Sequence, residues 1–261
     1  MFPFRNILLP DDSVNAQVAL QYATAFARHG RGRVVSLSVQ DAKEIEQAAI
    51  DHEIDLITVA TRDRNLLTRT FGSSLAEDII AESPCAVLAI SPPQKDFVDG
   101  QSEIQLKRML LATNFRPSSV AATQLATQMA NQFGAELHAV YVIGDYFEHI
   151  SVMFPEGGLA ALTRLRGYAQ ERMAHLSRGG GATHIAEGRP YQEIVKLADT
   201  LQADLIVIGT AVHGSLFGSS HVLGAEIERV IRNAPCPVLC VPAARVVTPL
   251  PALVTQIVPQ T

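Results

Sequence analysis

The sequence has no apolar run that approaches the roughly 18 residues needed by a membrane-spanning helix. It also has no tract rich in lysine or arginine, and its formal net charge is −5. A chain of this composition offers no broad positive field to a phosphate backbone. We therefore expect neither a membrane nor nucleic acid as a partner.

Cysteine is scarce: the 261 residues include three, Cys85, Cys236 and Cys240. Cys85 and Cys236 take equivalent places just before two apolar strands, which favours buried core thiols. No second cysteine or histidine pair accompanies them with the spacing of a zinc site. No metal site is predicted.

An apolar segment, NILLP at residues 6–10, follows the start of the sequence almost at once. It is typical of a buried strand. It leaves no room for a signal peptide with an apolar stretch and a cleavage site. We therefore expect a cytoplasmic protein.

What the sequence does contain is a repeat. Residues 55–90 recur with changes as residues 204–241, and each copy has an apolar strand, a loop, a helix, a Pro-Cys turn and a second apolar strand. Such a repeat indicates two related domains. The segment between the two halves has the prolines, glycine and charges of a linker. The predicted division is a shortened domain at 1–91, a linker at 92–105, a complete domain at 106–243 and a tail at 244–261.

Strand patterns alternate with helix patterns, which favours parallel sheets covered by helices. Four strands are predicted in the first domain and five in the second: 6–10, 33–39, 55–60, 86–90, 106–113, 136–142, 182–187, 204–208 and 238–241. The predicted helices are 14–29, 42–52, 74–81, 119–133, 159–176, 191–202 and 225–233. The expected fold is two doubly wound, parallel-sheet α/β domains of the Rossmann type in tandem. The strand missing from the first is expected at a sheet edge, because loss of an inner strand would leave two rows of backbone groups unpaired.

The C-terminal tail carries three prolines among valine and leucine, at Pro249, Pro251 and Pro259. Proline interrupts helices, so no further helix is expected there. An exposed apolar tail would be a liability. We expect it to pack on the other domain or on another subunit.

Several motifs together resemble the universal stress protein family. They are LLATNFRPSS, EGRPYQEIVKLA, DLIVIGT and APCPVLCVP in the second half, and ILLPDDS, DLITVAT and SPCAVLAI in the first. The resemblance implies a five-stranded, doubly wound fold of the adenine nucleotide alpha-hydrolase type. It also implies an intramolecular pseudo-dimer in which the last strands, 86–90 and 238–241, pair across the interface. A further homodimer and an unidentified protein partner are expected as well.

Members of that family that bind ATP carry Gly-x-x-Gly, nine further residues, and then Gly followed by Ser or Thr, just after the fourth strand. Glycines let the backbone approach phosphates, and the next helix offers free N–H groups and the positive end of its dipole. In such members an Asp after the first strand contacts the adenine or ribose side. The resemblance therefore gives each domain a set of positions to compare.

The first domain keeps the spacing of this pattern and loses its chemistry. The three glycine positions hold Ala60, Asp63 and Ser73, and only Ser74 matches. Asp63 places a carboxylate where phosphate charge would lie, although nearby arginines could offset it. Asp11, or the aspartate after it, could take the adenine-side position or serve as an ordinary helix N-cap. A degraded site with Asp11 and Ser74 as its remaining residues is predicted.

The second domain keeps the glycines but shifts their spacing. Gly209 and Gly214 are separated by four residues where the pattern has two, and Gly224 precedes Ala225 in place of Ser or Thr. Asn114 replaces the Asp after the first strand. Serine and histidine side chains between residues 213 and 221 could hold an anion in another way. The candidate nucleotide-site residues are Asn114, Val142, Gly209, Thr210, Gly214, Gly224 and Ala225.

Two functions are favoured, and a third is kept as an alternative. The first is a non-enzymatic stress-response or signalling protein whose second domain keeps a weakened site for ATP, ADP or AMP, with Mg²⁺ if the ligand is ATP. The second is an interaction or dimerisation module that has lost nucleotide binding. A slow ATPase is a third possibility. Neither domain offers a nucleophile with a base and an orienting acid, so no catalytic residue is predicted.

Overall fold

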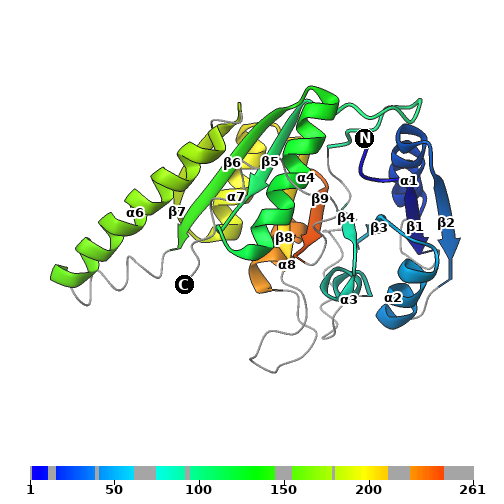
Figure 1. Ribbon diagram of the computed structural model, residues 1–261, viewed down its shortest axis with the longest axis horizontal. Helices are drawn as coiled ribbons and strands as arrows, with labels where there is room; N and C mark the ends of the chain where they lie inside the picture. The colour runs from blue at the N-terminus through cyan, green and yellow to red at the C-terminus, as the bar shows by residue number, and fades with distance from the viewer. Residues whose placement is uncertain are drawn as a thin grey trace.

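The computed structural model describes residues 2–10, 16–38, 41–61, 75–91, 95–144, 155–177, 180–210 and 224–243. In these residues the two halves of the chain share one nine-stranded sheet (Figure 1). Its strands are β1 (Asn6–Pro10), β2 (Arg33–Leu37), β3 (Leu56–Ala60), β4 (Ala86–Ile90), β5 (Arg108–Ala112), β6 (Glu136–Gly144), β7 (Ala182–Gly188), β8 (Leu205–Thr210) and β9 (Val238–Pro242). Their spatial order is β2-β1-β3-β4-β9-β8-β5-β6-β7.

The two halves meet where β4 pairs with β9. This pairing is antiparallel, with Leu88 opposite Leu239, whereas all other neighbouring strands of the sheet run parallel. The expected pairing of the two last strands is therefore present. Each half repeats one order, and the second half adds β7 outside β6. The tandem doubly wound fold is confirmed, and the strand that the first half lacks is an edge strand, as predicted.

Helices cover the sheet in two layers. One face carries α1 (Ala16–Gly30), α4 (Pro117–Phe133) and α6 (Pro155–Ser177), and the other carries α2 (Ala42–Asp51), α3 (Leu75–Glu82), α7 (Pro190–Thr200) and α8 (Ala225–Asn233). Because both faces are covered, the inner strands are buried along their length and have continuous apolar sequences. Within the described residues, no helix is both long and apolar enough to cross a membrane.

The start of α4 and the end of β8 differ from the predicted ranges. α4 begins at Pro117, before the predicted start at Ser119, because a proline without an N–H fits the first turn of a helix. β8 continues past the predicted end at residue 208 to Thr210, where it still pairs with β9. The end of β8 and the first turn of α4 consequently lie in contact.

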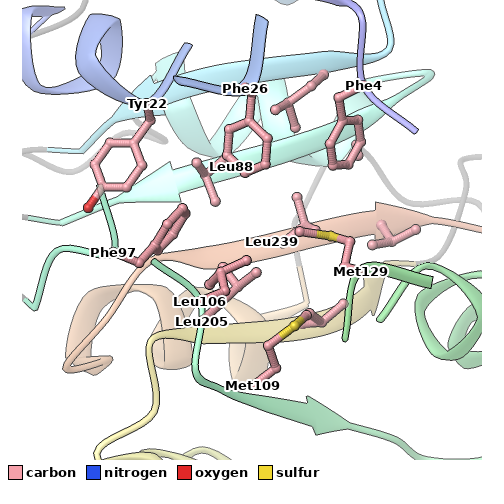
Figure 2. Close-up of a cluster of buried hydrophobic side chains, with 14 of the residues drawn as sticks. Phe4, Tyr22, Phe26, Leu88, Phe97, Leu106, Met109, Met129, Leu205 and Leu239 are labelled. Atoms are coloured by element: carbon pink, nitrogen blue, oxygen red, sulfur yellow. The ribbon is translucent and has the colours of Figure 1, made fainter. Parts of the chain in front are cut away.

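One buried cluster runs through both halves on the face covered by α1 and α4 (Figure 2). Phe97, which is 1% exposed, belongs to it and comes from the segment predicted as a linker. Its ring lies 4.9 Å from that of Tyr22 and 6.0 Å from that of Phe26, both in α1. Leu106 and Leu205 of the second half belong to the same cluster. The two units therefore share a core as well as a sheet.

The segment 95–105 folds as a short hairpin. Val98 and Ile104 form an antiparallel bridge. The Tyr22 hydroxyl of α1 donates a hydrogen bond to Asp96 at 2.5 Å. The segment between the halves is thus fixed to the first half by packing and by hydrogen bonding, instead of acting as a loose spacer.

An aspartate next to β3 and another next to β8 fasten these strands to their neighbours. Asp204 Oδ2 accepts two consecutive backbone N–H groups where β5 begins, each at 2.8 Å. Asp55 accepts two where β1 begins, each at 3.1 Å. Asp204 is 3% exposed and also lies 2.6 Å from the Lys95 ammonium, whereas Asp55 is partly exposed. In each half an aspartate accepts two backbone N–H groups of the neighbouring strand. In the second half the aspartate also pairs with Lys95 of the hairpin.

We expect Asp204→Ala to lower the free energy of unfolding by about 3–5 kcal/mol, because it removes the buried acceptor of two backbone N–H groups and of the Lys95 ammonium. Asp55→Ala removes the matching backbone contacts at a partly exposed place and should cost about 1–2 kcal/mol. Urea denaturation followed by circular dichroism measures both. Equal losses in the two variants would show that neither burial nor Lys95 adds to the stability that the aspartate provides.

Two histidines link the outer strand β7 to β6 in addition to the backbone ladder. His138 Nδ1 lies 3.1 Å from His184 Nε2, and the ring centroids are 5.4 Å apart. The distance between the centroids is close to the sum of the N–N distance and the two ring radii. The two nitrogens therefore lie nearly on the line that joins the ring centres and point toward each other. One must donate and the other accept, so the hydrogen bond is lost when both imidazoles are protonated. Burial, together with the neighbouring His138, lowers the pKa of His184 below its ordinary value of 6.5.

The protein should therefore lose stability as the pH falls below 6.5. A depressed histidine pKa means that the unfolded chain takes up the proton more readily, so this contribution is present above the unfolded pKa and is lost below it. His184→Gln keeps a hydrogen-bonding side chain that does not titrate. Its unfolding free energy should fall less than that of the wild type between about pH 7.5 and about pH 5.5. Identical pH slopes for the two proteins would remove His184 as the sensitive group.

Candidate functional site

Residues predicted for nucleotide binding in the second half gather at the carboxyl edge of the sheet. Asn114 follows β5, Val142 lies in the last part of β6, and Thr210 ends β8. Gly224 and Ala225 begin α8. The carboxyl ends of parallel strands meet at one edge, where doubly wound folds bind their ligands. The topology therefore brings these residues to one place.

Other predicted site residues lie outside the described residues. They are Gly214 and the loop side chains at 213–221 in the second half, and Asp11, Asp63, Ser73 and Ser74 in the first half. The tail at 244–261 lies outside as well. The described part of the candidate site therefore comes from the second half alone.

Asn114 combines a structural task with a free donor. Its Oδ1 accepts the N–H of Arg116 at 3.0 Å and the hydroxyl of Ser119 at 2.7 Å, which shapes the turn into α4. Within the described part of the chain, its Nδ2 group has no protein partner. An aspartate could make the same turn but would offer no donor. Asn114 can therefore donate to an acceptor on a base or a sugar.

Val142 offers its backbone instead of its side chain. The side chain packs into the buried cluster on the α7 face. Val140 O accepts the N–H of Thr113, so Val140 turns its backbone groups toward the side of β5. Backbone groups alternate along a strand, and those of Val142 point to the same side, where β5 has already ended at Ala112. Among the described residues, one N–H and one C=O of Val142 are thus available for the polar edge of a flat ring.

The two described glycines of the predicted phosphate loop meet different constraints. A Cβ on Gly209 would collide with Ser118 O and lie 3.1 Å from Ser119 Cα, so the close approach of α4 demands glycine there. A Cβ on Gly224 would meet no described residue within 4 Å. Gly224 has φ −54° and ψ 131°, which any residue can adopt. The packing of α4 therefore requires Gly209, whereas no described residue occupies the space beside Gly224.

The first turn of α8 presents free backbone donors. Gly224 O accepts the N–H groups of Ile227 and Glu228. In the described chain, no hydrogen bond uses the N–H groups of Ala225 and Glu226. Free N–H groups at the positive end of a helix attract an anion.

Carboxylates lie in the same turn. Glu226 and Glu228 are both in the first turn of α8. Glu226 Oε2 accepts the N–H of Tyr191, in the first turn of α7, at 3.0 Å, and Oε1 lies 3.1 Å from Arg229. The Arg229 guanidinium lies 5.4 Å from the centre of the Tyr191 ring. The turn thus attracts an anion through its backbone and repels it through its side chains.

An aromatic group beside Asn114 was missed at the level of sequence. Phe115 has a left-handed backbone with φ 57°, which is uncommon for a bulky residue and is often found at functional sites. Its ring stacks on Tyr141 at 4.9 Å and meets Tyr168 of α6 edge-on at 5.9 Å. Burial, together with Tyr168, raises the pKa of Tyr141. The motif LLATNFRPSS contains Phe115, but no local pattern shows its contact with α6.

The three cysteines are free and buried, as predicted for core thiols. Burial raises the pKa of Cys236 and of Cys240 to about 12, so both remain thiols at neutral pH. Among the residues that the structure describes, no three His, Cys, Asp or Glu side chains group in a way that could hold a metal ion.

The geometry defines a doubly wound α/β unit, present twice, with a candidate ligand site at its carboxyl edge. The model of the universal stress protein family matches residues 32–91 and 105–242, so the chain belongs to this family. A universal stress protein of Methanocaldococcus jannaschii is 34% identical over 145 residues, which are 52% of this chain and 81% of that protein. One of Thermus aquaticus is 33% identical over 138 residues, 52% of this chain and 98% of that protein.

Solved structures agree on the fold. The crystal structure of a universal stress protein from Archaeoglobus fulgidus matches with a TM-score of 0.62 and 18% identity, and covers 91% of this chain and 98% of that chain. A protein of Pseudomonas aeruginosa described as functionally unknown matches with a TM-score of 0.62 and 17% identity, and covers 92% and 93% of the two chains. At these identities the likeness supports the fold alone.

Gly209→Ala should lower the free energy of unfolding by about 1–3 kcal/mol, because the added Cβ meets the backbone of α4. Gly100→Ala is the matched control, since a Cβ on Gly100 meets nothing within 4 Å. Gly224→Ala should resemble this control. Urea denaturation of the three variants tests the assignment, and a Gly209→Ala protein as stable as the control would show that packing does not demand this glycine.

Proposed function

We propose that the protein is a non-enzymatic stress-response or signalling protein whose second half binds an adenine nucleotide weakly at the carboxyl edge of the sheet. The observation that carries the proposal is Gly224. Among the described residues, nothing lies within 4 Å of a Cβ at this position, and no hydrogen bond uses the N–H groups of the two residues that follow. No described neighbour requires a glycine there, and a glycine lets a phosphate group approach the backbone closely.

The described residues suit the parts of such a ligand. The Nδ2 group of Asn114 can donate to a ring nitrogen or a ribose hydroxyl. The backbone of Val142 supplies one donor and one acceptor, which matches the edge of adenine that carries an amino group beside a ring nitrogen. The N–H groups of Ala225 and Glu226 can hold a phosphate oxygen. If the ligand is ATP, its Mg²⁺ would be held mainly by the phosphates, because no metal-binding group lies among the described residues.

The absence of an enzymatic role is also part of the proposal. In the described chain, no nucleophile near Asn114 or Gly224 has a base and an orienting acid beside it. Cys236 and Cys240 are buried thiols with a raised pKa, so they do not act as thiolate nucleophiles at this edge, and Cys85 is buried as well. We expect ATP turnover to stay at background with saturating Mg²⁺ and ATP.

The first half serves, in this proposal, as the structural partner of the second. Its counterpart of Gly209 is Ala60, which is 4% exposed and packs in the shared core. Within the described residues it has no strand outside β2 and no counterpart of α6 between β2 and α2. A single site in the second half follows. A further homodimer and a protein partner that reads the nucleotide state remain predictions.

The alternative is an interaction module without nucleotide binding. Two observations favour it. The Oδ1 of Asn114 is already used in its own turn, and the first turn of α8 carries two carboxylates. In that case Gly209 would be kept for packing alone.

Calorimetry with AMP, ADP and ATP decides between the two. We expect at least one of them to bind with a Kd in the range of about 0.1 to 1 mM. Gly224→Asp should weaken binding at least about tenfold, because its carboxylate lies beside the phosphate, while aspartate is a good N-cap and keeps α8 intact. Gly100→Asp makes the same charge change in open space and should bind like the wild type. No heat from any nucleotide at millimolar concentration would favour the interaction module.

A further inference from the structure

A carboxylate from the first turn of α8 binds the amino end of α7. Glu226 is the second residue of α8, and its Oε2 accepts the N–H of Tyr191, the second residue of α7, at 3.0 Å. The carboxylate therefore occupies the kind of position that an anionic ligand takes at a helix amino terminus. At the amino end of α7, a side chain of the protein thus takes the place of an anionic ligand.

The surrounding charges keep Glu226 in this position. Arg229 lies 3.1 Å from Oε1 and covers the Tyr191 ring, so the carboxylate is held from both sides. Glu228 adds a second carboxylate to the first turn, 2.8 Å from Arg232. Both arginines lie further along α8 than the carboxylates that they pair with. A phosphate at Ala225 N–H would thus meet negative side chains before positive ones.

We infer that Glu226 is a specificity-determining residue, which makes the site prefer adenosine and AMP to ATP. This inference rests on the proposed function. The groups that would contact the base are the Asn114 amide and the Val142 backbone, which carry no charge, so these contacts are the same for adenosine, AMP, ADP and ATP. The phosphate end has lost the Ser or Thr hydroxyl of the family pattern at Ala225 and holds two carboxylates. Each added phosphate therefore brings more repulsion than new bonding.

The electrostatic effect is large enough to measure. Like charges within one helical turn of each other change an affinity by about five- to tenfold at low ionic strength. The effect grows from AMP to ADP to ATP as the ligand charge increases. Mg²⁺ neutralises part of the charge of ATP, so it should reduce the discrimination.

Calorimetry with adenosine, AMP, ADP and ATP, at low salt without Mg²⁺, tests the inference on the wild type and on Glu226→Gln. Glutamine keeps an oxygen that can accept the Tyr191 N–H, so the contact between α7 and α8 is retained. ATP affinity should rise about five- to tenfold in the variant, while adenosine affinity changes less than about twofold. Glu44→Gln is the matched control, since Glu44 is a first-turn acid of α2 in the first half. Glu228→Gln removes the other carboxylate without touching Tyr191 and should shift affinity in the same direction.

The outcomes separate this inference from the proposed function. Adenosine or AMP binding more tightly than ATP, with the gap narrowed in Glu226→Gln and unchanged in Glu44→Gln, supports it. ATP binding more tightly than AMP in the wild type, or an unchanged ratio of ATP to adenosine affinity in Glu226→Gln, overturns the inference and leaves the nucleotide site standing. If none of the four compounds binds either protein, the proposed function fails and the inference fails with it.

Discussion

The pairing of β4 with β9 is the interaction on which the rest of the structure depends. Three consecutive residue pairs, from Val87 with Cys240 to Ala89 with Val238, turn two half-sheets into one. Both strands are apolar and buried in the joined sheet. Without this pairing each would be an exposed apolar edge strand, and such edges promote aggregation. Because the pairing is antiparallel, it keeps α1 and α4 on the same face of the sheet, and a common core forms between them.

The shortening of the first half is tolerable because of where it occurs. The missing strand would lie outside β2, far from the β4–β9 joint, and β2 itself is only partly buried. The hairpin at 95–105 adds Phe97 to the shared core and places Lys95 on Asp204. The first half thus keeps the strands next to the β4–β9 pairing. The strand that it lacks would lie at the opposite end of its half-sheet, away from the second half.

The sequence predicts local and periodic features well and distant contacts poorly. The strands were predictable because burial on both faces requires unbroken apolar runs, and the β4–β9 joint followed from the family resemblance. The segment 92–105 has the composition of a linker because its prolines and charges outnumber its apolar residues, yet in its described part, 95–105, the apolar Phe97 and Val98 pack in the core. The contact between Glu226 and Tyr191 joins two helices that are distant in the chain, so no spacing rule reveals it. The free Nδ2 of Asn114 likewise depends on a turn that only the structure shows.

The glycines of the phosphate-loop pattern are needed for different physical reasons. Gly209 is demanded by the backbone of α4 at a distance that no Cβ could accept, so it would be kept whether or not a ligand binds. Its counterpart Ala60 packs in the buried core of the first half. Gly224 is different, because neither its backbone angles nor its described neighbours require glycine. The proposal of a ligand therefore depends on Gly224 and not on Gly209, and the inferred preference among ligands depends on the carboxylates that follow Gly224.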